Sequence, residues 1–181
     1  MAGASELERG AARLSVLLDR EGRLTFDRQY SAVVAAEAFH WLDWLRVLPR
    51  IGASLVPGGH LILVERALAE SLPWESELRV LIRDYSTNPD YMPYGTVTEL
   101  EARGLITVDG RACTETLAYC QAIDGYVESF HSRNGFSRAR PPSRRAQEFD
   151  DRLKALLGRY RPDGTVWLPV QARIVWVRPA M

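Results

Sequence analysis

Hydrophobic positions along this chain follow two spacings, one typical of strands and one typical of helices. Residues 31–36 form a short, continuous apolar run of small and β-branched side chains, as expected for a parallel strand covered on both faces. The following segment has apolar residues every three or four positions, as in a helix: Leu42, Leu45, Leu48, Ile51 and Leu55. Pro57–Gly59 should end this helix, and residues 60–67 form another apolar run. Together these patterns predict a βαβ unit with two parallel strands.

The rest of the chain continues to alternate between helical and extended patterns. Helical spacing is found in residues 5–19, 73–85, 96–104, 123–134 and 143–160. Residues 105–120 are β-branched around an Asp-Gly pair, which predicts either a hairpin or a strand with a bulge, and residues 165–178 alternate as a strand. We therefore expect an α/β fold with a mostly parallel sheet, an antiparallel C-terminal strand or hairpin at its edge, and helices on both faces.

Composition indicates an ordinary globular domain with no strong electrostatic preference. The 181 residues are 46% hydrophobic and 25% charged, with 23 basic and 23 acidic side chains, which does not favour nucleic acid or an anionic membrane. Five arginines without an acid lie between Arg133 and Arg145, and a solvated loop explains them better than a nucleic-acid patch. Cys113 and Cys120 match no metal spacing, and no apolar leader or long apolar run occurs. We expect a cytoplasmic protein with no metal and no membrane partner.

The first candidate site follows the first predicted strand. In open α/β sheets, ligands bind beyond the carboxyl ends of the strands, which points to residues 36–41. Glu37, His40 and Trp41 would place a carboxylate, an imidazole and an indole at the rim of a pocket. The alternative is that Phe39 and Trp41 pack under the next helix and His40 caps it. Both interpretations remain open at the level of local chemistry.

Residues 30–67 resemble the second half of a class I S-adenosylmethionine-dependent methyltransferase domain of the broad small-molecule type. The resemblance rests on a strand ending in His40–Trp41, the following helix, the Leu-x-Pro-Gly-Gly turn and the next strand; residues 127–138 and 172–179 extend it. It implies S-adenosylmethionine as cofactor and a small organic molecule as methyl acceptor. Ala36, Glu37, His40 and Trp41 would then border the methionine end of the cofactor, with His40 as a candidate catalytic residue.

The sequence also departs from that family. The family binds its cofactor with a glycine-rich G-x-G turn, and this chain contains no such triplet. We therefore expect one truncated domain over residues 1–181, in which residues 1–29 are an atypical N-terminal helix and connector and residues 30–181 a family-like C-terminal half. Methyl transfer would be impaired by the missing half; the alternative is a catalytically inactive remnant that acts as a binding or dimerisation module. The edge of strand 31–36 would be covered by N-terminal residues or by a second copy in a homodimer.

Two further groups are weaker candidates. Tyr85, Tyr91 and Tyr94 surround a loop that could line a substrate pocket, although tyrosines in surface loops usually just pack. His131 could act as a general base with Glu128 on the same helix face. The alternative for His131 is a helix-end residue that caps backbone carbonyls.

Overall fold

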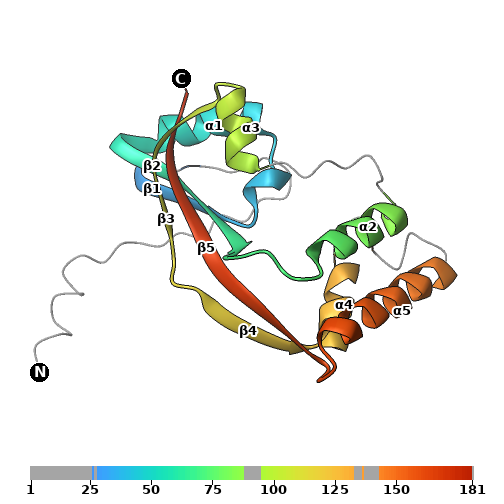
Figure 1. The fold of residues 1–181 in the computed structure, drawn as a ribbon. Helices are drawn as coiled ribbons and strands as arrows, with labels where there is room; N and C mark the ends of the chain where they lie inside the picture. Colours follow the sequence, from blue (N-terminus) through green and yellow to red (C-terminus); the bar gives the residue numbers. More distant parts are fainter. Residues whose placement is uncertain (1–25, 27, 88–94, 133–135, 137–142, 181) are drawn as a thin grey trace, which may run out of the picture.

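The structure of the protein is a computed structural model that describes residues 26, 28–87, 95–132, 136 and 143–180 (Figure 1). Its strands are β1 (Tyr30–Ala36), β2 (Leu55–Leu68), β3 (Ile106–Cys113), β4 (Leu117–Ala122) and β5 (Thr165–Pro179). Its helices are the 3-10 turn η1 (Phe39–Trp41), α1 (Trp44–Ser54), α2 (Glu75–Tyr85), α3 (Thr96–Ala102), α4 (Ile123–His131) and α5 (Ser143–Tyr160). The predicted helix at residues 5–19 lies outside the described residues.

The five strands form one mixed sheet in which β5 is central. Its order is β1-β2-β5-β3, and β4 pairs with β5 beyond β3. β1 and β2 are parallel, whereas β5 is antiparallel to β2, β3 and β4. The sheet thus has a single strand, β5, running against the others, which confirms the expected α/β fold with an antiparallel C-terminal strand. β5 lies inside the sheet, however, and not at its edge.

The position of β5 follows from its apolar residues, which occupy both of its faces. The register of β5 with β2 and β4 shows no irregularity, so successive side chains point to opposite faces. Val166 and Leu168 pack into a core with α2, α4 and α5. Val175 and Val177 pack into a second core with α1 and α3. The two cores therefore lie on opposite faces, near the two ends of β5 (Figure 1), and the prediction of helices on both faces is confirmed.

The βαβ unit forms as predicted, with differences at both of its strands. Asp43 is the N-cap of α1, where its carboxylate accepts a hydrogen bond from the backbone N–H of Arg46. The glycine turn does not separate α1 from β2 but bulges within β2, because the register jumps from Leu55 to His60. Gly59 fits this bulge closely, because an added Cβ would lie 3.0 Å from the carbonyl oxygen of Val56 and 3.1 Å from those of Tyr30 and Ser31, which is tighter than ordinary contacts.

The prediction that residues 31–36 are covered on both faces is wrong for the part of the chain that the structure describes. Val33 and Ala35 are partly buried and pack against the core under α1. Val34, on the other face, is 60% exposed. The reason is that β1 is the outer strand of the described sheet and that α1 and α3 cover only one face of it.

The Asp-Gly pair forms a bulge, one of the two predicted alternatives, and not a hairpin, because β3 and β4 both pair with β5 instead of with each other. The β3 register shifts between Val108 and Gly110. Gly110 lies opposite Trp176, whose indole ring covers the glycine so closely that an added Cβ would be 2.2 Å from ring atom Cζ2. The ring can occupy this place only because residue 110 has no side chain.

Gly110→Ala should therefore destabilise the protein by about 1–3 kcal/mol, since the methyl group forces Trp176 out of its place. Urea denaturation measures the change. Gly158→Ala is the matched control: in helix α5 no atom lies within 4 Å of the added Cβ. Alanine should there stabilise the protein by about 0.5–1 kcal/mol. Equal effects of the two substitutions would contradict the packing argument.

A charged cluster crosses the sheet beside the bulge. Arg178 donates two hydrogen bonds to the Asp109 carboxylate, both of 2.7 Å, and His60 Nε2 lies 3.1 Å from Asp109 Oδ2. Hydrogen bonding to Arg178 is the main reason that the pKa of Asp109 is lowered, with smaller contributions from the charge of Arg178 and from His60, while desolvation opposes the shift. The cluster joins β2, β3 and β5.

The lowered pKa of Asp109 predicts how this cluster responds to acid. A carboxyl group with a lowered folded-state pKa stabilises the fold above its unfolded pKa of about 3.9, and the contribution is lost as the pH falls through the folded value. Asp109→Asn should lower Tm at pH 6, and the difference from the parent should shrink as the pH falls below the unfolded pKa of about 3.9. Thermal denaturation from pH 7 to pH 2.5 measures this. Glu70→Gln, which changes an exposed carboxyl group, should show no such convergence.

Candidate functional site

The carboxyl end of β1 leads into a residue with an unusual backbone conformation. Glu37 has φ of +50°, the only positive φ of a non-glycine residue in the described ranges. Its N–H donates a 3.0 Å hydrogen bond to the carbonyl of Val64, and its side-chain Oε1 accepts from the backbone N–H of Arg66. The conformation is thus held by two bonds to β2. Such strained residues cluster at functional sites, and this one lies where an α/β sheet binds ligands.

The residues after Glu37 separate into buried and exposed positions. Phe39 is 4% exposed and packs into the core with α1, and its carbonyl accepts a 3.0 Å hydrogen bond from Trp44 Nε1. His40 is exposed and Trp41 is 70% exposed, with their rings 4.9 Å apart. The alternative that Phe39 and Trp41 pack under the next helix is therefore correct for Phe39 and wrong for Trp41. His40 is not the cap of α1, since Asp43 takes that position.

Ala36, Glu37, His40 and Trp41 form what we call the β1 rim. All four are exposed, and they are adjacent because they follow one another at the end of one strand. One oxygen of Glu37 is engaged by Arg66, and the other can still accept from a cationic or hydroxyl group. The exposed indole face suits a cation or a flat ring. This set can hold a polar, positively charged ligand against an aromatic surface.

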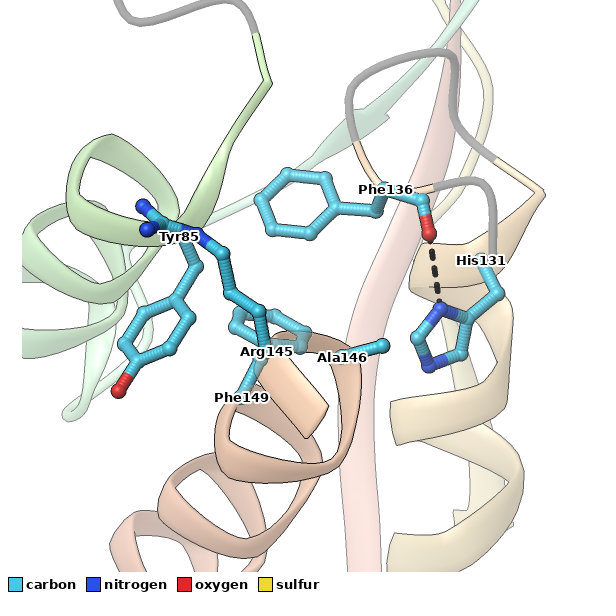
Figure 2. Close-up of a pocket in the computed structure, with 6 residues that line it drawn as sticks. All are labelled: Tyr85, His131, Phe136, Arg145, Ala146 and Phe149. Atoms are coloured by element: carbon cyan, nitrogen blue, oxygen red, sulfur yellow. Dashed lines mark hydrogen bonds between the residues drawn. The ribbon is translucent and has the colours of Figure 1, made fainter. Parts of the chain in front are cut away.

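A second group of candidate residues lies elsewhere in the fold, between α2, α4 and α5. Tyr85 and His131, which are far apart in sequence, line the same shallow depression (Figure 2). The depression has room for about one water molecule. Its other lining residues are Phe136, Arg145, Ala146 and Phe149. The guanidinium of Arg145 lies 5.5 Å from the centre of the Tyr85 ring and donates to the carbonyl of Asp84. Tyr91 and Tyr94 lie outside the described residues.

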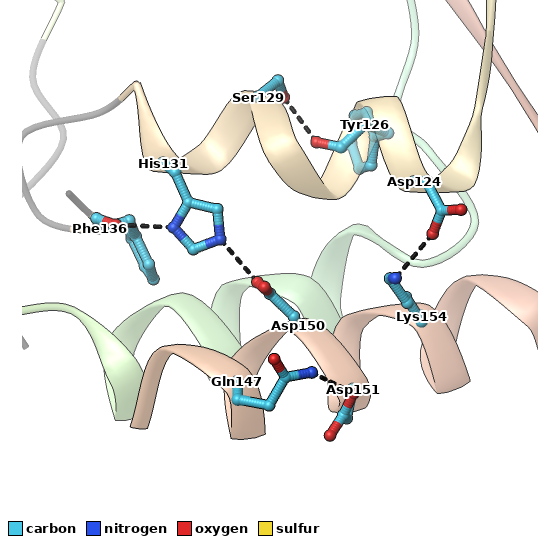
Figure 3. A network of polar contacts seen from close by, with 9 residues as sticks. All are labelled: Asp124, Tyr126, Ser129, His131, Phe136, Gln147, Asp150, Asp151 and Lys154. Atoms are coloured by element: carbon cyan, nitrogen blue, oxygen red, sulfur yellow. Dashed lines mark hydrogen bonds and ion pairs between the residues drawn. The ribbon is translucent and has the colours of Figure 1, made fainter. Parts of the chain in front are cut away.

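His131 is held on both sides of its ring (Figure 3). Nδ1 lies 2.9 Å from the carbonyl of Phe136, and Nε2 lies 2.7 Å from Oδ1 of Asp150. A carbonyl only accepts, so Nδ1 carries a proton. Nε2 then faces the Asp150 carboxyl group, which binds the other side of the ring. The side chains are only 6% and 9% exposed.

The helical spacing predicts that His131 pairs with Glu128, whereas the structure pairs His131 with Asp150. The sequence nevertheless indicates that Asp150 needs a partner. Asp150 lies on the apolar face of the α5 pattern, three residues before Leu153 and next to Phe149, where a carboxylate needs a partner. Both ring nitrogens of His131 are engaged within the protein, and its catalytic role stays a prediction.

His131→Ala should lower the free energy of unfolding by about 3 kcal/mol, because it leaves the buried Asp150 carboxyl without its imidazole. The double variant His131→Phe with Asp150→Leu should recover most of that loss, since no buried charge remains. Urea denaturation of His131→Phe, Asp150→Leu and the double variant measures the coupling. Ser132→Ala, at an exposed position beside His131, is the control, with an expected change within about 0.5 kcal/mol. Additive effects would show that the pair is not a unit.

The described part of the chain offers neither a metal site nor a membrane-spanning helix. No group of three or more His, Cys, Asp or Glu side chains in these ranges could hold a metal ion. None of the helices within the described part of the chain is long and apolar enough to cross a membrane.

Comparison with curated proteins identifies relatives over part of the chain. No protein-family model matches the sequence. Proteins of Mycobacterium bovis and Mycobacterium tuberculosis, each described as an uncharacterized methyltransferase, are 38% identical over 78 residues. The match covers 39% of this chain and 31% of theirs. The chain therefore matches about a third of the length of these relatives.

Solved structures extend the likeness to most of the chain. A protein from Anaeromyxobacter dehalogenans, assigned as a type II methyltransferase, superposes with a TM-score of 0.52 at 17% identity, covering 83% of this chain and 65% of its own. An S-adenosylmethionine-dependent methyltransferase from Geobacter sulfurreducens, solved with S-adenosylhomocysteine, has a TM-score of 0.36 at 16% identity and covers 88% and 61%. Only the first is close enough to establish a shared fold. Over the part that this superposition covers, the chain shares the α/β fold of that methyltransferase, with a single antiparallel strand β5 and helices on both faces of the sheet.

Proposed function

We propose that this protein takes part in methyl transfer from S-adenosylmethionine to a small organic acceptor and that the β1 rim holds the methionine end of the cofactor. The observation that carries the proposal is the strained Glu37 at the carboxyl end of β1, pinned by two hydrogen bonds to β2. The methyltransferase relatives support the reaction class. They do not identify the acceptor.

The rim residues fit the cationic part of the cofactor. When bound, S-adenosylmethionine supplies an electrophilic methyl group on a positively charged sulfur. The exposed face of Trp41 can hold such a cation, and the unengaged oxygen of Glu37 can accept from the ammonium group. The adenosine end needs backbone to approach closely, and the sequence has no G-x-G triplet for that purpose. The proposal therefore assigns only the methionine end to the rim.

The acceptor needs alignment more than activation. Methyl transfer to an already nucleophilic atom depends mainly on placing that atom in line with the methyl group and the sulfur. His40, exposed beside Trp41, is the candidate to take a proton from the acceptor. Tyr85 and His131 belong to the other group of residues, between α2, α4 and α5, so their predicted roles as acceptor wall (with Tyr91 and Tyr94) and as base do not form part of this proposal.

A non-catalytic role is the second candidate. It is favoured by the absence of a G-x-G triplet and by the open side of β1 in the described sheet, which offers backbone groups to another chain. A binding or dimerisation module would use that edge and would not need the cofactor.

Titration with S-adenosylhomocysteine separates these two functions. Calorimetry should give a dissociation constant in the micromolar range, about −8 kcal/mol. Trp41→Ala should weaken binding by roughly 3- to 30-fold through loss of the aromatic surface. Trp167→Ala is the matched control, since this tryptophan is 45% exposed on β5 and takes no part in the rim; binding should be unchanged.

Two outcomes would contradict the proposal. Absence of heat at millimolar ligand would favour the non-catalytic module. Equal weakening by Trp41→Ala and Trp167→Ala would show that the rim is not where the ligand binds.

A further inference from the structure

The β1 rim is fixed at one end by β2, and its other end needs a separate support. Glu37 is pinned by its two hydrogen bonds to β2, but Trp41 lies four residues further along the chain. Between them, no described side chain caps the start of the turn η1. A ligand that contacts both the carboxylate and the indole requires these groups at a fixed separation. Something besides β2 must therefore hold the turn that carries His40 and Trp41.

Trp44 supplies that support. The carbonyl of Phe39 accepts a 3.0 Å hydrogen bond from Nε1 of Trp44 and a 3.2 Å bond from the N–H of Leu42. Burial of the Phe39 ring keeps the turn near the core, and the bonds of its carbonyl set the orientation of the turn. The Leu42 bond only closes the turn on itself, whereas the Trp44 bond ties it to the first residue of α1. The turn is thus attached through the indole N–H to a helix that is anchored in the core.

The ring of Trp44 is itself held from the end of α3. The guanidinium of Arg103 lies 5.5 Å from the centre of the indole ring, a distance typical of a cation–π contact. Arg103 is kept there by Glu99, whose Oε1 lies 2.6 Å from Nη2 of the arginine. Leu100, on the same helix, is fully buried in the core that also contains Phe39. A continuous chain of contacts therefore runs from α3 through Arg103 and Trp44 to the turn.

We propose that Trp44 is the positioning residue of the β1 rim and that Arg103 sets the place of the Trp44 ring. The inference rests on the proposed function, since it takes the rim to be where the cofactor binds. Trp44 acts through the carbonyl of Phe39, which determines how the next two residues, His40 and Trp41, are presented. The affinity of the rim for its ligand is then controlled from α3.

Trp44→Phe tests this attachment without any ligand, because it removes the indole N–H and keeps an aromatic ring. The turn should open more easily, so that hydrogen exchange of the Leu42 amide becomes roughly 2- to 10-fold faster, as expected for the loss of one hydrogen bond. Trp74→Phe is the matched control, since Nε1 of Trp74 is buried and has no hydrogen-bond partner among the described residues. There the exchange of the Leu42 amide should stay unchanged.

The role of the arginine is tested by two substitutions at an exposed side chain, which should both leave the protein folded. Arg103→Met removes the cation, and Arg103→Lys retains it, so lysine should restore most of the exchange protection of the Leu42 amide that methionine loses. Arg79→Met is the matched control. Arg79 forms an ion pair of the same spacing and length with Glu75, 2.6 Å, but on α2, which packs against the other core.

Calorimetry with S-adenosylhomocysteine then shows whether the orientation of the turn matters for binding. Trp44→Phe and Arg103→Met should each weaken binding by roughly 2- to 10-fold. Trp74→Phe, Arg79→Met and Arg103→Lys should bind nearly as the parent does.

Two results would overturn the inference. The Leu42 amide could exchange no faster in Trp44→Phe than in the parent and in Trp74→Phe. Alternatively, Trp44→Phe could speed this exchange and still bind S-adenosylhomocysteine as tightly as the parent, which would show that the rim needs no positioning. Failure of the proposed function looks different: the parent would give no heat with the ligand, while faster exchange in Trp44→Phe would still confirm that Trp44 holds the turn.

Discussion

The pairing of β5 with three other strands is the constraint on which the rest of the structure depends. β3 and β4 have no other strand partner among the described residues, and β2 has only β1 besides β5. Because β5 runs for fifteen residues without a bulge, its side chains alternate strictly, and apolar residues at both of its ends place one core on each face of the sheet. Each helix needs only one apolar stripe, because the apolar residues of β5 determine which face of the sheet the helix covers and near which end of β5 it packs.

The two groups of candidate residues have different physical characters. At the β1 rim, a carboxylate, an imidazole and an indole are exposed, while the backbone that carries them is fixed by bonds to β2. In the depression beside α5, the imidazole of His131 is buried and both of its nitrogens are bound within the protein. A binding site needs exposed groups on a rigid support, and the rim meets this condition. The His131–Asp150 pair links α4 to α5, and His131 also binds the carbonyl of Phe136. Such buried hydrogen-bonded networks fix how the elements that they connect pack together.

Local patterns predicted most elements of the fold because local physics decides them. Spacing identified α1 and α5, and Asp43 marked the start of a helix through its own hydrogen bond. Long-range strand pairing could not be predicted in the same way. The pattern of residues 165–178 does not indicate that this strand inserts between β2 and β3. The pattern of residues 31–36 does not indicate which face of that strand is exposed. For the site, strand order placed the rim at Glu37, His40 and Trp41, but the strain at Glu37 and the pairing of His131 with Asp150 depend on residues distant in sequence.

The central strand is also the last element in sequence order, and this has a consequence for how the protein forms on the ribosome. A nascent chain that has emerged as far as α5 already contains β2, β3 and β4, yet the strand that must join them has not been made. Until it arrives, three strands present unsatisfied backbone groups to solvent, and only the local helices can form early. This chain should thus depend more on holding chaperones during synthesis than a domain of equal size whose sheet grows from its first strands.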